Sequence, residues 1–249
     1  MEIIREETGL TGHMRHPVTV IVEAADDIVY SAVDIEDGIK KGVLTWAELV
    51  AELDGDGSAI KGTPLLKSVI EGVKRQLGCD GPKDHIDEDA FGQAFRIQAI
   101  GHVIPYVRAT FDKRFDQIDT GMYDEELVFD KACEAADFVN ACKQVGKKWV
   151  YSSKDVLRLE LMGRRIIHDL MDIFWEGAAL GGPKLKTKDY PGKAYRLISG
   201  NYRHVFQKEI ESEKGFGNIQ YHRAQLVVDY VAGMTDTFAL DLHKRLFNG

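Results

Sequence analysis

The sequence predicts an all-α protein, and two observations carry that prediction. The 249-residue chain contains only six prolines, and it has hardly any stretch in which β-branched residues alternate with polar ones at a period of two. Signals for the beginning and end of helices recur instead along the whole chain. We therefore expect a multi-helix bundle without a sheet.

The first three expected helices have clear boundaries. One helix covers residues 19–38, and the next, up to about residue 53, is opened by a capping box between Thr45 and Glu48. A third helix begins at Thr63-Pro64, where threonine supplies the N-cap and proline the first helical position, and it ends at Gly78.

The remaining helices are longer or less sharply bounded. A long helix begins within residues 84–89 and carries Pro105, which we expect to kink it. Asp229 and Asp236 are expected to pair with arginines across the bundle, and Gly233 to mark a close helix crossing. With no break in composition, one all-α region over residues 1–249 is the simplest organisation. The other expected segments are helices at about 130–143, from 152–155 to 177, at 193–212 and at 220–246, with a linker at 177–192.

The first helix has an unusual distribution of side chains. At about 100° per residue, its polar side chains share a sector roughly 100° wide, and apolar ones cover most of the remaining circumference. A helix of this kind is expected to be surrounded by other helices, so that its acidic stripe faces an internal cleft. The polar sector holds Thr19, Glu23, Asp26, Asp27, Tyr30, Asp34 and Asp37, and the apolar arc holds Val18, Ile21, Val22, Ala25, Ile28, Val29, Ala32, Val33 and Ile35.

Within this stripe, Asp26, Tyr30 and Asp34 are successive neighbours four residues apart and form one ridge. No lysine or arginine interrupts the ridge, and carboxylates in a row repel one another unless a cation or a hydrogen-bonding ligand compensates them. The ridge therefore indicates a site for a metal ion or a polar ligand. The alternative is the solvated face of a helix at the edge of the bundle.

Composition and charge restrict the class of protein. A formal charge of −8 argues against a sequence-independent grip on nucleic acid, although a local basic groove is compatible with it. Three scattered cysteines indicate neither a disulfide framework nor a cysteine-rich zinc site. We find no apolar run long enough to span a membrane and no signal peptide, and we expect a cytoplasmic protein.

Three segments resemble the carboxy-terminal half of the deoxyguanosine triphosphate triphosphohydrolases, which belong to the HD-domain phosphohydrolase superfamily. They are RHPVTVIVEAADDIVYSAVDIEDG, ISGNYRHVF and QLVVDYVAGMTDTFALDLHKRL. The resemblance implies an HD-domain-like helical bundle that removes the whole triphosphate from a deoxynucleoside triphosphate. It also implies a divalent metal, magnesium or manganese, and a homo-oligomer.

The resemblance implies roles for six residues. Asp26 matches an aspartate that binds the metal, Tyr30 a tyrosine against the sugar and phosphates, and Asp34 a carboxylate that reads the 3′-hydroxyl of deoxyribose. Arg203 and Tyr202 resemble part of the nucleotide or phosphate pocket, and Arg196 is a second candidate. The arginines have an ordinary alternative as solvated or salt-bridged surface residues.

The sequence departs from the family where the metal centre should be completed. The two histidines and the adjacent aspartate that should precede Asp26 are missing, and the late dipeptide His168-Asp169 is not expected to replace them. Because a catalytic divalent ion normally needs three or more protein ligands, we expect a truncated form that is inactive alone. The alternative is a non-catalytic helical module that binds a nucleotide or a partner subunit.

Overall fold

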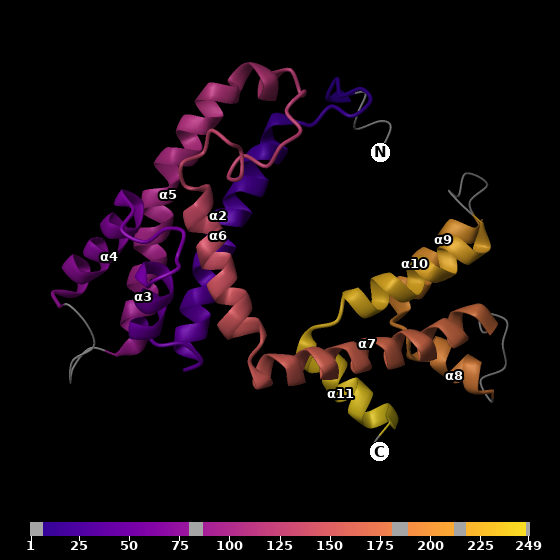
Figure 1. Ribbon diagram of the computed structural model, residues 1–249. Helices are drawn as coiled ribbons and strands as arrows, with labels where there is room; N and C mark the ends of the chain where they lie inside the picture. The colour runs from indigo at the N-terminus through magenta and orange to yellow at the C-terminus, as the bar shows by residue number, and fades with distance from the viewer. Residues whose placement is uncertain (1–6, 80–86, 181–188, 212–217, 248–249) are drawn as a thin grey trace. The chain divides into compact units, whose positions relative to one another are not determined.

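The computed structural model describes residues 7–79, 87–180, 189–211 and 218–247 (Figure 1). Every regular element in these ranges is a helix, which confirms the all-α prediction. The chain divides into two compact units, Met1–Val156 and Leu157–Gly249. Whether both units act as the single region expected from the composition stays a prediction. No helix in the described ranges combines the length and apolar character needed to cross a membrane.

The first unit is built around two long helices that lie side by side. Helix α2, Pro17–Lys40, packs along α5, Glu88–Asp119, and α6, Ala136–Val145, lies against α2 as well (Figure 1). Helix α4, Pro64–Leu77, covers another side of α5, and α3, Trp46–Asp54, completes the unit. The α2 helix agrees with the predicted 19–38 to within two residues at each end.

The predicted caps of the short helices are confirmed. Thr45 and Glu48 form the capping box of α3, and the Thr63 hydroxyl accepts a hydrogen bond from the Leu66 backbone at the start of α4. Gly78 ends α4 with φ 67°, a left-handed conformation that favours glycine. These local signals needed no information about tertiary packing.

A buried carboxylate links α2 to α5. Glu36 is buried, its Oε1 lies 2.7 Å from Lys40 Nζ, and its other oxygen accepts a hydrogen bond from Arg96 on α5. Burial alone would raise the pKa of Glu36, but the hydrogen bonds from Lys40 and Arg96 outweigh it and the pKa lies below its usual value. The helix that carries the acidic stripe is thus fixed to α5 by an ion pair as well as by apolar packing.

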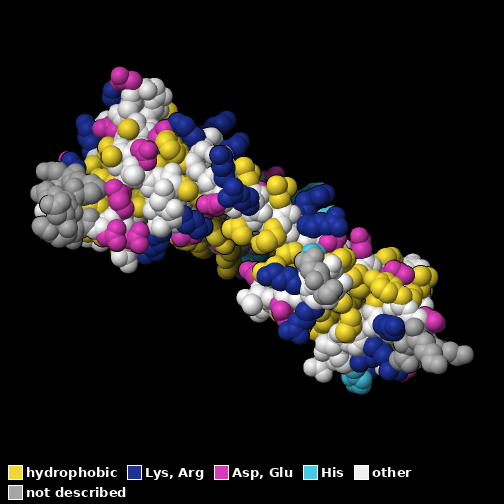
Figure 2. All heavy atoms as spheres, turned by 90° about the horizontal axis from the view of Figure 1, so that it is seen from below, with side chains coloured by type: hydrophobic (Ala, Val, Ile, Leu, Met, Phe, Trp, Pro, Cys, Tyr) yellow, Lys and Arg dark blue, Asp and Glu magenta, His cyan; other side chains and the backbone are white. Residues whose placement is uncertain are grey.

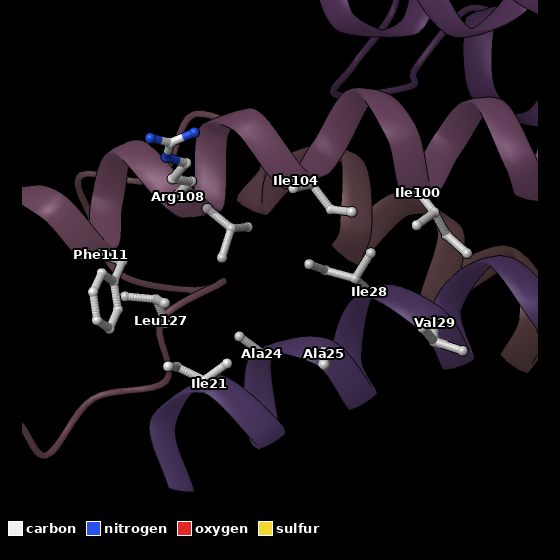
Figure 3. Close-up of a pocket in the computed structure, with 11 residues that line it drawn as sticks. Ile21, Ala24, Ala25, Ile28, Val29, Ile100, Ile104, Arg108, Phe111 and Leu127 are labelled. Atoms are coloured by element: carbon white, nitrogen blue, oxygen red, sulfur yellow. The ribbon is translucent and has the colours of Figure 1, made fainter. Parts of the chain in front are cut away.

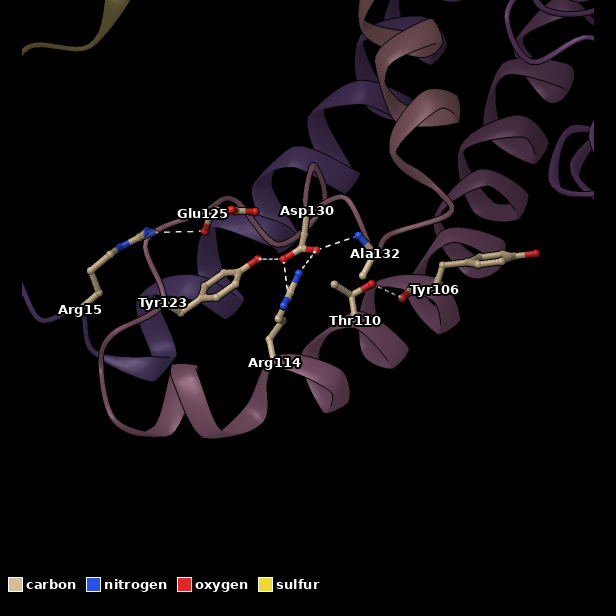
Figure 4. A network of polar contacts seen from close by, with 8 residues as sticks. All are labelled: Arg15, Tyr106, Thr110, Arg114, Tyr123, Glu125, Asp130 and Ala132. Atoms are coloured by element: carbon tan, nitrogen blue, oxygen red, sulfur yellow. Dashed lines mark hydrogen bonds and ion pairs between the residues drawn. The ribbon is translucent and has the colours of Figure 1, made fainter.

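The predicted helix at 130–143 begins later than expected because Asp130 has another role. Its carboxylate accepts hydrogen bonds from Arg114 Nε at 2.9 Å, the Tyr123 hydroxyl at 2.9 Å and the Ala132 backbone at 2.8 Å (Figure 4). Asp130 therefore holds the loop between α5 and α6, and the helix starts only at Ala136. It is followed by a π-helical turn, η1, Gly146–Tyr151.

The second unit consists of α7 to α11, and α7 begins just before the boundary. The long predicted helix after residues 152–155 is confirmed as α7, and Ser153 caps it by accepting from the Val156 backbone at 3.4 Å. The core of this unit contains Phe174 and Tyr230, whose rings meet edge to face with centroids 4.9 Å apart. The elements are α7 Lys154–Leu180, α8 Tyr190–Leu197, α9 Gly200–Glu211, α10 Ile219–Ala232 and α11 Asp236–Phe247.

Two predicted helices of this unit are each broken in two. The expected helix at 193–212 is interrupted after Leu197, whose carbonyl accepts a hydrogen bond from the Tyr230 hydroxyl at 3.0 Å. The expected helix at 220–246 is interrupted at Gly233, where a Cβ atom would lie 2.2 Å from the Tyr202 hydroxyl. The close crossing predicted at Gly233 is confirmed.

The predictions for Asp229 and for the linker were partly wrong. Asp229 accepts a hydrogen bond from Gln225 at 2.5 Å, and among the described residues neither it nor Asp236 forms an ion pair with an arginine. Residues 177–180 continue α7, and the missing side chain of Gly177 admits the backbone of α8 there. Residues 181–188 of the expected linker lie outside the described ranges.

Candidate functional site

The ridge of Asp26, Tyr30 and Asp34 lies on the accessible side of α2. Asp26 is exposed, 61% of Tyr30 is exposed, and Asp34 is half-buried. All three are within a regular α-helix whose N-cap is the His16 side chain, which accepts a hydrogen bond from the Val18 backbone at 3.2 Å. The helix therefore presents a carboxylate, a phenol and a second carboxylate along one line.

The expectation that other helices surround α2 is wrong for the described part of the first unit. Helices α5 and α6 and the η1 turn cover one side, and they bury the residues of α2 that face them. Much of the predicted apolar arc remains exposed, because no described element of this unit covers it. The exposed members are Val18, Ile21, Val22, Ala25 and Val29.

This uncovered face of α2 opens into an apolar groove. The groove holds about 300 Å³ between α2 and α5, and Figure 3 shows Ile28, Ile100 and Ile104 pointing toward one another across it. Arg108 contributes to its wall while its guanidinium group points away. In Figure 2, hydrophobic side chains likewise gather in patches on the surface between charged ones. The groove itself offers almost no hydrogen-bonding group, so it suits an apolar partner rather than a nucleotide.

The acidic stripe is partly neutralised by basic residues from other segments. Lys143 Nζ on α6 lies 2.6 Å from Asp27 Oδ1, and Arg15 forms an ion pair with Glu23. Within the described ranges, Asp26 has no hydrogen-bond or ion-pair partner. Of the two adjacent aspartates, Asp26 is therefore the one available to a ligand.

Asp34 has a partner that the sequence did not reveal. The Tyr151 hydroxyl, at the end of η1, donates a hydrogen bond to Asp34 Oδ2 at 2.5 Å. This hydrogen bond, together with partial burial, raises the pKa of Tyr151 to about 12. The two residues are 117 positions apart, and no motif around Tyr151 marks it, so only the tertiary structure could identify the contact.

The three predicted residues of the second unit are on two helices. Arg196 is exposed on α8, whereas Tyr202 and Arg203 are half-buried on α9, so Arg196 is not on the same helix as the other two. The Arg203 guanidinium carbon lies 5.7 Å from the centre of the Tyr195 ring, and its buried Nε has no hydrogen-bond partner among the described residues.

The Tyr202 side chain packs against α10 within the second unit. Its ring meets Tyr230 edge to face with centroids 5.6 Å apart, and its hydroxyl lies against the end of α10 at Gly233. Packing accounts for the Tyr202 ring, whereas the buried Nε of Arg203 has no hydrogen-bond partner among the described residues.

In the dipeptide His168-Asp169, the aspartate has a structural role. Asp169 Oδ2 lies 2.8 Å from His243 Nε2 and 2.8 Å from Arg165 Nε, while His168 is exposed. The hydrogen bond with His243 lowers the pKa of Asp169, with a smaller effect of the same sign from Arg165. The aspartate thus joins α7 to α11.

The residues of the ridge do not form a metal centre by themselves. In the described ranges, no three His, Cys, Asp or Glu side chains are grouped closely enough to hold an ion. Asp26 could contribute one hard oxygen ligand, but a stable divalent site needs at least two more protein ligands.

Comparison with known proteins agrees with the three sequence segments. Residues 128–245 match the phosphohydrolase-associated domain. The deoxyguanosinetriphosphate triphosphohydrolase of Yersinia pestis (strain Pestoides F) is 28% identical over 258 aligned positions that include 98% of this chain. The chain is similar over nearly its whole length to deoxyguanosinetriphosphate triphosphohydrolases.

A second triphosphohydrolase, from Klebsiella pneumoniae subsp. pneumoniae, is 29% identical over the same share of the chain. In both comparisons the chain covers 51% of the triphosphohydrolase, and it therefore spans about half the length of the relatives it matches. The matched half is the carboxy-terminal part, as the resemblance indicated.

Proposed function

We propose that this chain is the nucleotide-contacting, carboxy-terminal part of a metal-dependent deoxynucleoside triphosphate triphosphohydrolase. The reaction releases a deoxynucleoside and inorganic triphosphate. The observation that carries the proposal is the accessible ridge on α2, in which Asp26 has no partner among the described residues and Tyr30 exposes 61% of its surface. The names of the relatives support the substrate class.

Each residue of the ridge has a role that its chemistry permits. Asp26 provides one oxygen ligand for magnesium or manganese, the Tyr30 ring packs against the sugar, and Asp34 accepts a hydrogen bond from the 3′-hydroxyl. When bound, the metal would offset the negative charge of the phosphates and activate a water molecule. Because the ridge supplies a single candidate ligand, we assign no step of the reaction to this chain alone.

The same proposal assigns phosphate and nucleotide contacts to residues of the second unit. Arg203 carries a buried Nε without a partner among the described residues, and a guanidinium fork is well suited to phosphate. Tyr202 and Arg196 are retained as nucleotide-binding candidates, Arg196 because it is exposed on α8. These assignments in the second unit do not depend on the ridge, and Arg203→Ala tests the one with the strongest support.

The proposal is tested by calorimetric titration of the chain with dGTP, first for the parent and then for Tyr30→Ala, Asp34→Ala and Arg203→Ala. We expect binding by the parent and a loss of roughly ten- to a hundredfold in affinity for Asp34→Ala, since a charge-assisted hydrogen bond is removed. Arg165→Ala is a suitable control because Asp169 is the one ion-pair partner of this exposed arginine among the described residues. Equal affinities in all variants would contradict the assigned roles.

A non-catalytic module is the second candidate. The exposed apolar face of α2 and the lack of a three-ligand group in the described ranges favour it. Release of triphosphate by a full-length protein containing this sequence, lost in Asp26→Ala, would decide in favour of the enzyme. Nucleotide or subunit binding without such release would favour the module.

A further inference from the structure

The Asp34 carboxylate is held from one side by a residue far along the chain. The Tyr151 hydroxyl donates to Oδ2 at 2.5 Å, and among the described residues Oδ1 has no hydrogen-bond donor. A carboxylate is an acceptor at both oxygens, so one oxygen remains for another donor. Asp34 is half-buried and 47% of Tyr151 is exposed, so the contact lies where a ligand can reach it.

The backbone that carries Tyr151 is fixed against α2. Val150 is buried beside Gly38 of α2, where a Cβ atom would lie 2.6 Å from the Val150 side chain. Gly146, at the start of the same π-helical turn, faces the Asp34 side chain, since a Cβ there would lie 3.7 Å from Asp34 Cβ. The η1 turn therefore sets the position of the phenol rather than leaving it to a mobile loop, and π-helical turns of this kind are frequent at functional sites.

We propose that Tyr151 is a positioning residue for sugar recognition. By holding Oδ2 of Asp34, its hydroxyl turns Oδ1 toward a ligand hydroxyl and fixes the rotamer before the ligand arrives. This inference rests on the proposed function, in which Asp34 accepts from the 3′-hydroxyl of a deoxynucleotide. The ligand class is a nucleotide with a free 3′-hydroxyl, and fixing the acceptor in advance lowers the entropy lost on binding.

The experiment compares the affinities of the chain for dGTP and for 2′,3′-dideoxyguanosine triphosphate. The ratio of the two affinities measures recognition of the 3′-hydroxyl and is insensitive to a general loss of folded protein. We expect Tyr151→Phe to lower this ratio about three- to tenfold, because the acceptor loses its fixed orientation. Affinity for the dideoxy compound should stay unchanged.

A matched control is Tyr106→Phe. Tyr106 is a half-buried tyrosine of the same unit, and its hydroxyl has no hydrogen-bond partner among the described residues. In the Asp34→Ala background, Tyr151→Phe should cause no further change in the ratio if Tyr151 acts through Asp34. An additional drop there would show that Tyr151 contacts the ligand independently, and that would overturn the positioning role.

A measurement without a nucleotide tests the contact itself. With tyrosine labelled at Cζ, the NMR signal lost in Tyr151→Phe should titrate with a pKa of about 12 in the parent. In Asp34→Ala it should fall toward the ordinary value of about 10. An ordinary pKa in the parent would overturn the inference while leaving the proposed function intact.

The nucleotide experiment distinguishes a failure of the positioning role from a failure of the proposed function. If the parent prefers dGTP and Tyr151→Phe keeps that preference, the positioning role is wrong and the proposed function stands. If the parent binds neither nucleotide, or binds both equally, the proposed function fails and the positioning role fails with it.

Discussion

Lys143 Nζ lies 2.6 Å from Asp27 Oδ1, whereas the adjacent Asp26 has no ion-pair partner among the described residues. The two aspartates are about 100° apart around α2, so a basic residue from α6 reaches one and leaves the other to solvent. The sequence EAADD does not reveal this difference. This difference in pairing predicts opposite consequences for removing the two carboxylates.

Asp26→Ala in a full-length protein containing this sequence should abolish metal-dependent turnover and leave the helical content unchanged. Asp27→Ala should keep activity within a few-fold and lower the free energy of unfolding by at most about 1 kcal/mol, since it removes a partly exposed ion pair. Rates of triphosphate release and chemical unfolding of both variants measure these effects. Activity of Asp26→Ala close to that of the parent would remove Asp26 from the metal site.

The Asp130 carboxylate predicts a pH dependence of stability. Hydrogen bonding by Arg114, with smaller contributions from the Ala132 backbone and Tyr123, lowers the pKa of Asp130 to about 2, and the residue is only 1% exposed. Because the folded-state pKa lies below the unfolded value near 4, the contribution of Asp130 to the free energy of unfolding is complete above about pH 4. It is lost as the pH falls from about 4 to 2, and it amounts to about 2 kcal/mol.

The measurement is urea unfolding at several pH values between 5 and 2.5, followed by tryptophan fluorescence. Other carboxylates also titrate in this range, so the comparison with Asp130→Asn isolates the effect. The variant should be less stable than the parent at pH 7, and the difference between them should shrink as the pH falls. A constant difference would show that Asp130 is not held as an anion.

Two glycines of α7 predict opposite effects of the same substitution. A Cβ at Gly177 would lie 2.7 Å from the Tyr195 backbone nitrogen, whereas no atom of the described residues lies within 4 Å of one at Gly163. Gly163→Ala should raise the free energy of unfolding by about 0.5–1 kcal/mol through helix propensity. Gly177→Ala should lower it by about 1–2 kcal/mol, because overpacking against a backbone outweighs that gain.

Thermal unfolding of the two variants beside the parent tests this pair. Both changes add one methyl group to the same helix, so they differ mainly in the space that receives it. An equal increase in Tm for both would mean that α8 does not pack at Gly177 in solution.

These contacts also show which features a sequence can predict. The capping box at Thr45 and the end of α4 at Gly78 each depend on residues within one helical turn, and both were predicted correctly. The late start of α6 was not predicted, because the side chains that donate hydrogen bonds to Asp130 are Arg114 and Tyr123, on a different segment. Local chemistry is readable in the order of residues, whereas long-range polar contacts are not.

The candidate site shows the same division. The ridge of Asp26, Tyr30 and Asp34 follows from helical periodicity, and the structure keeps it on one accessible line of α2. Periodicity could not show that Lys143 neutralises Asp27 or that Tyr151 holds Asp34. It also predicted enclosure for an apolar arc that is largely exposed, because the amphipathic pattern records which face prefers burial without identifying its partner.

The exposed apolar arc predicts that the chain associates with a second copy of itself. Ile21 on α2 and Ile104 on α5 are 49% and 50% exposed and line the same apolar groove. Exposed apolar side chains that form a continuous patch favour association. We expect sedimentation velocity to show larger species as the concentration rises, and the double substitution Ile21→Glu, Ile104→Glu to restore the monomer, because charges would be buried without partners. Met122→Glu, at an exposed position outside the groove, should behave like the parent. A parent that stays monomeric throughout, or a double variant that associates equally, would contradict self-association through this groove.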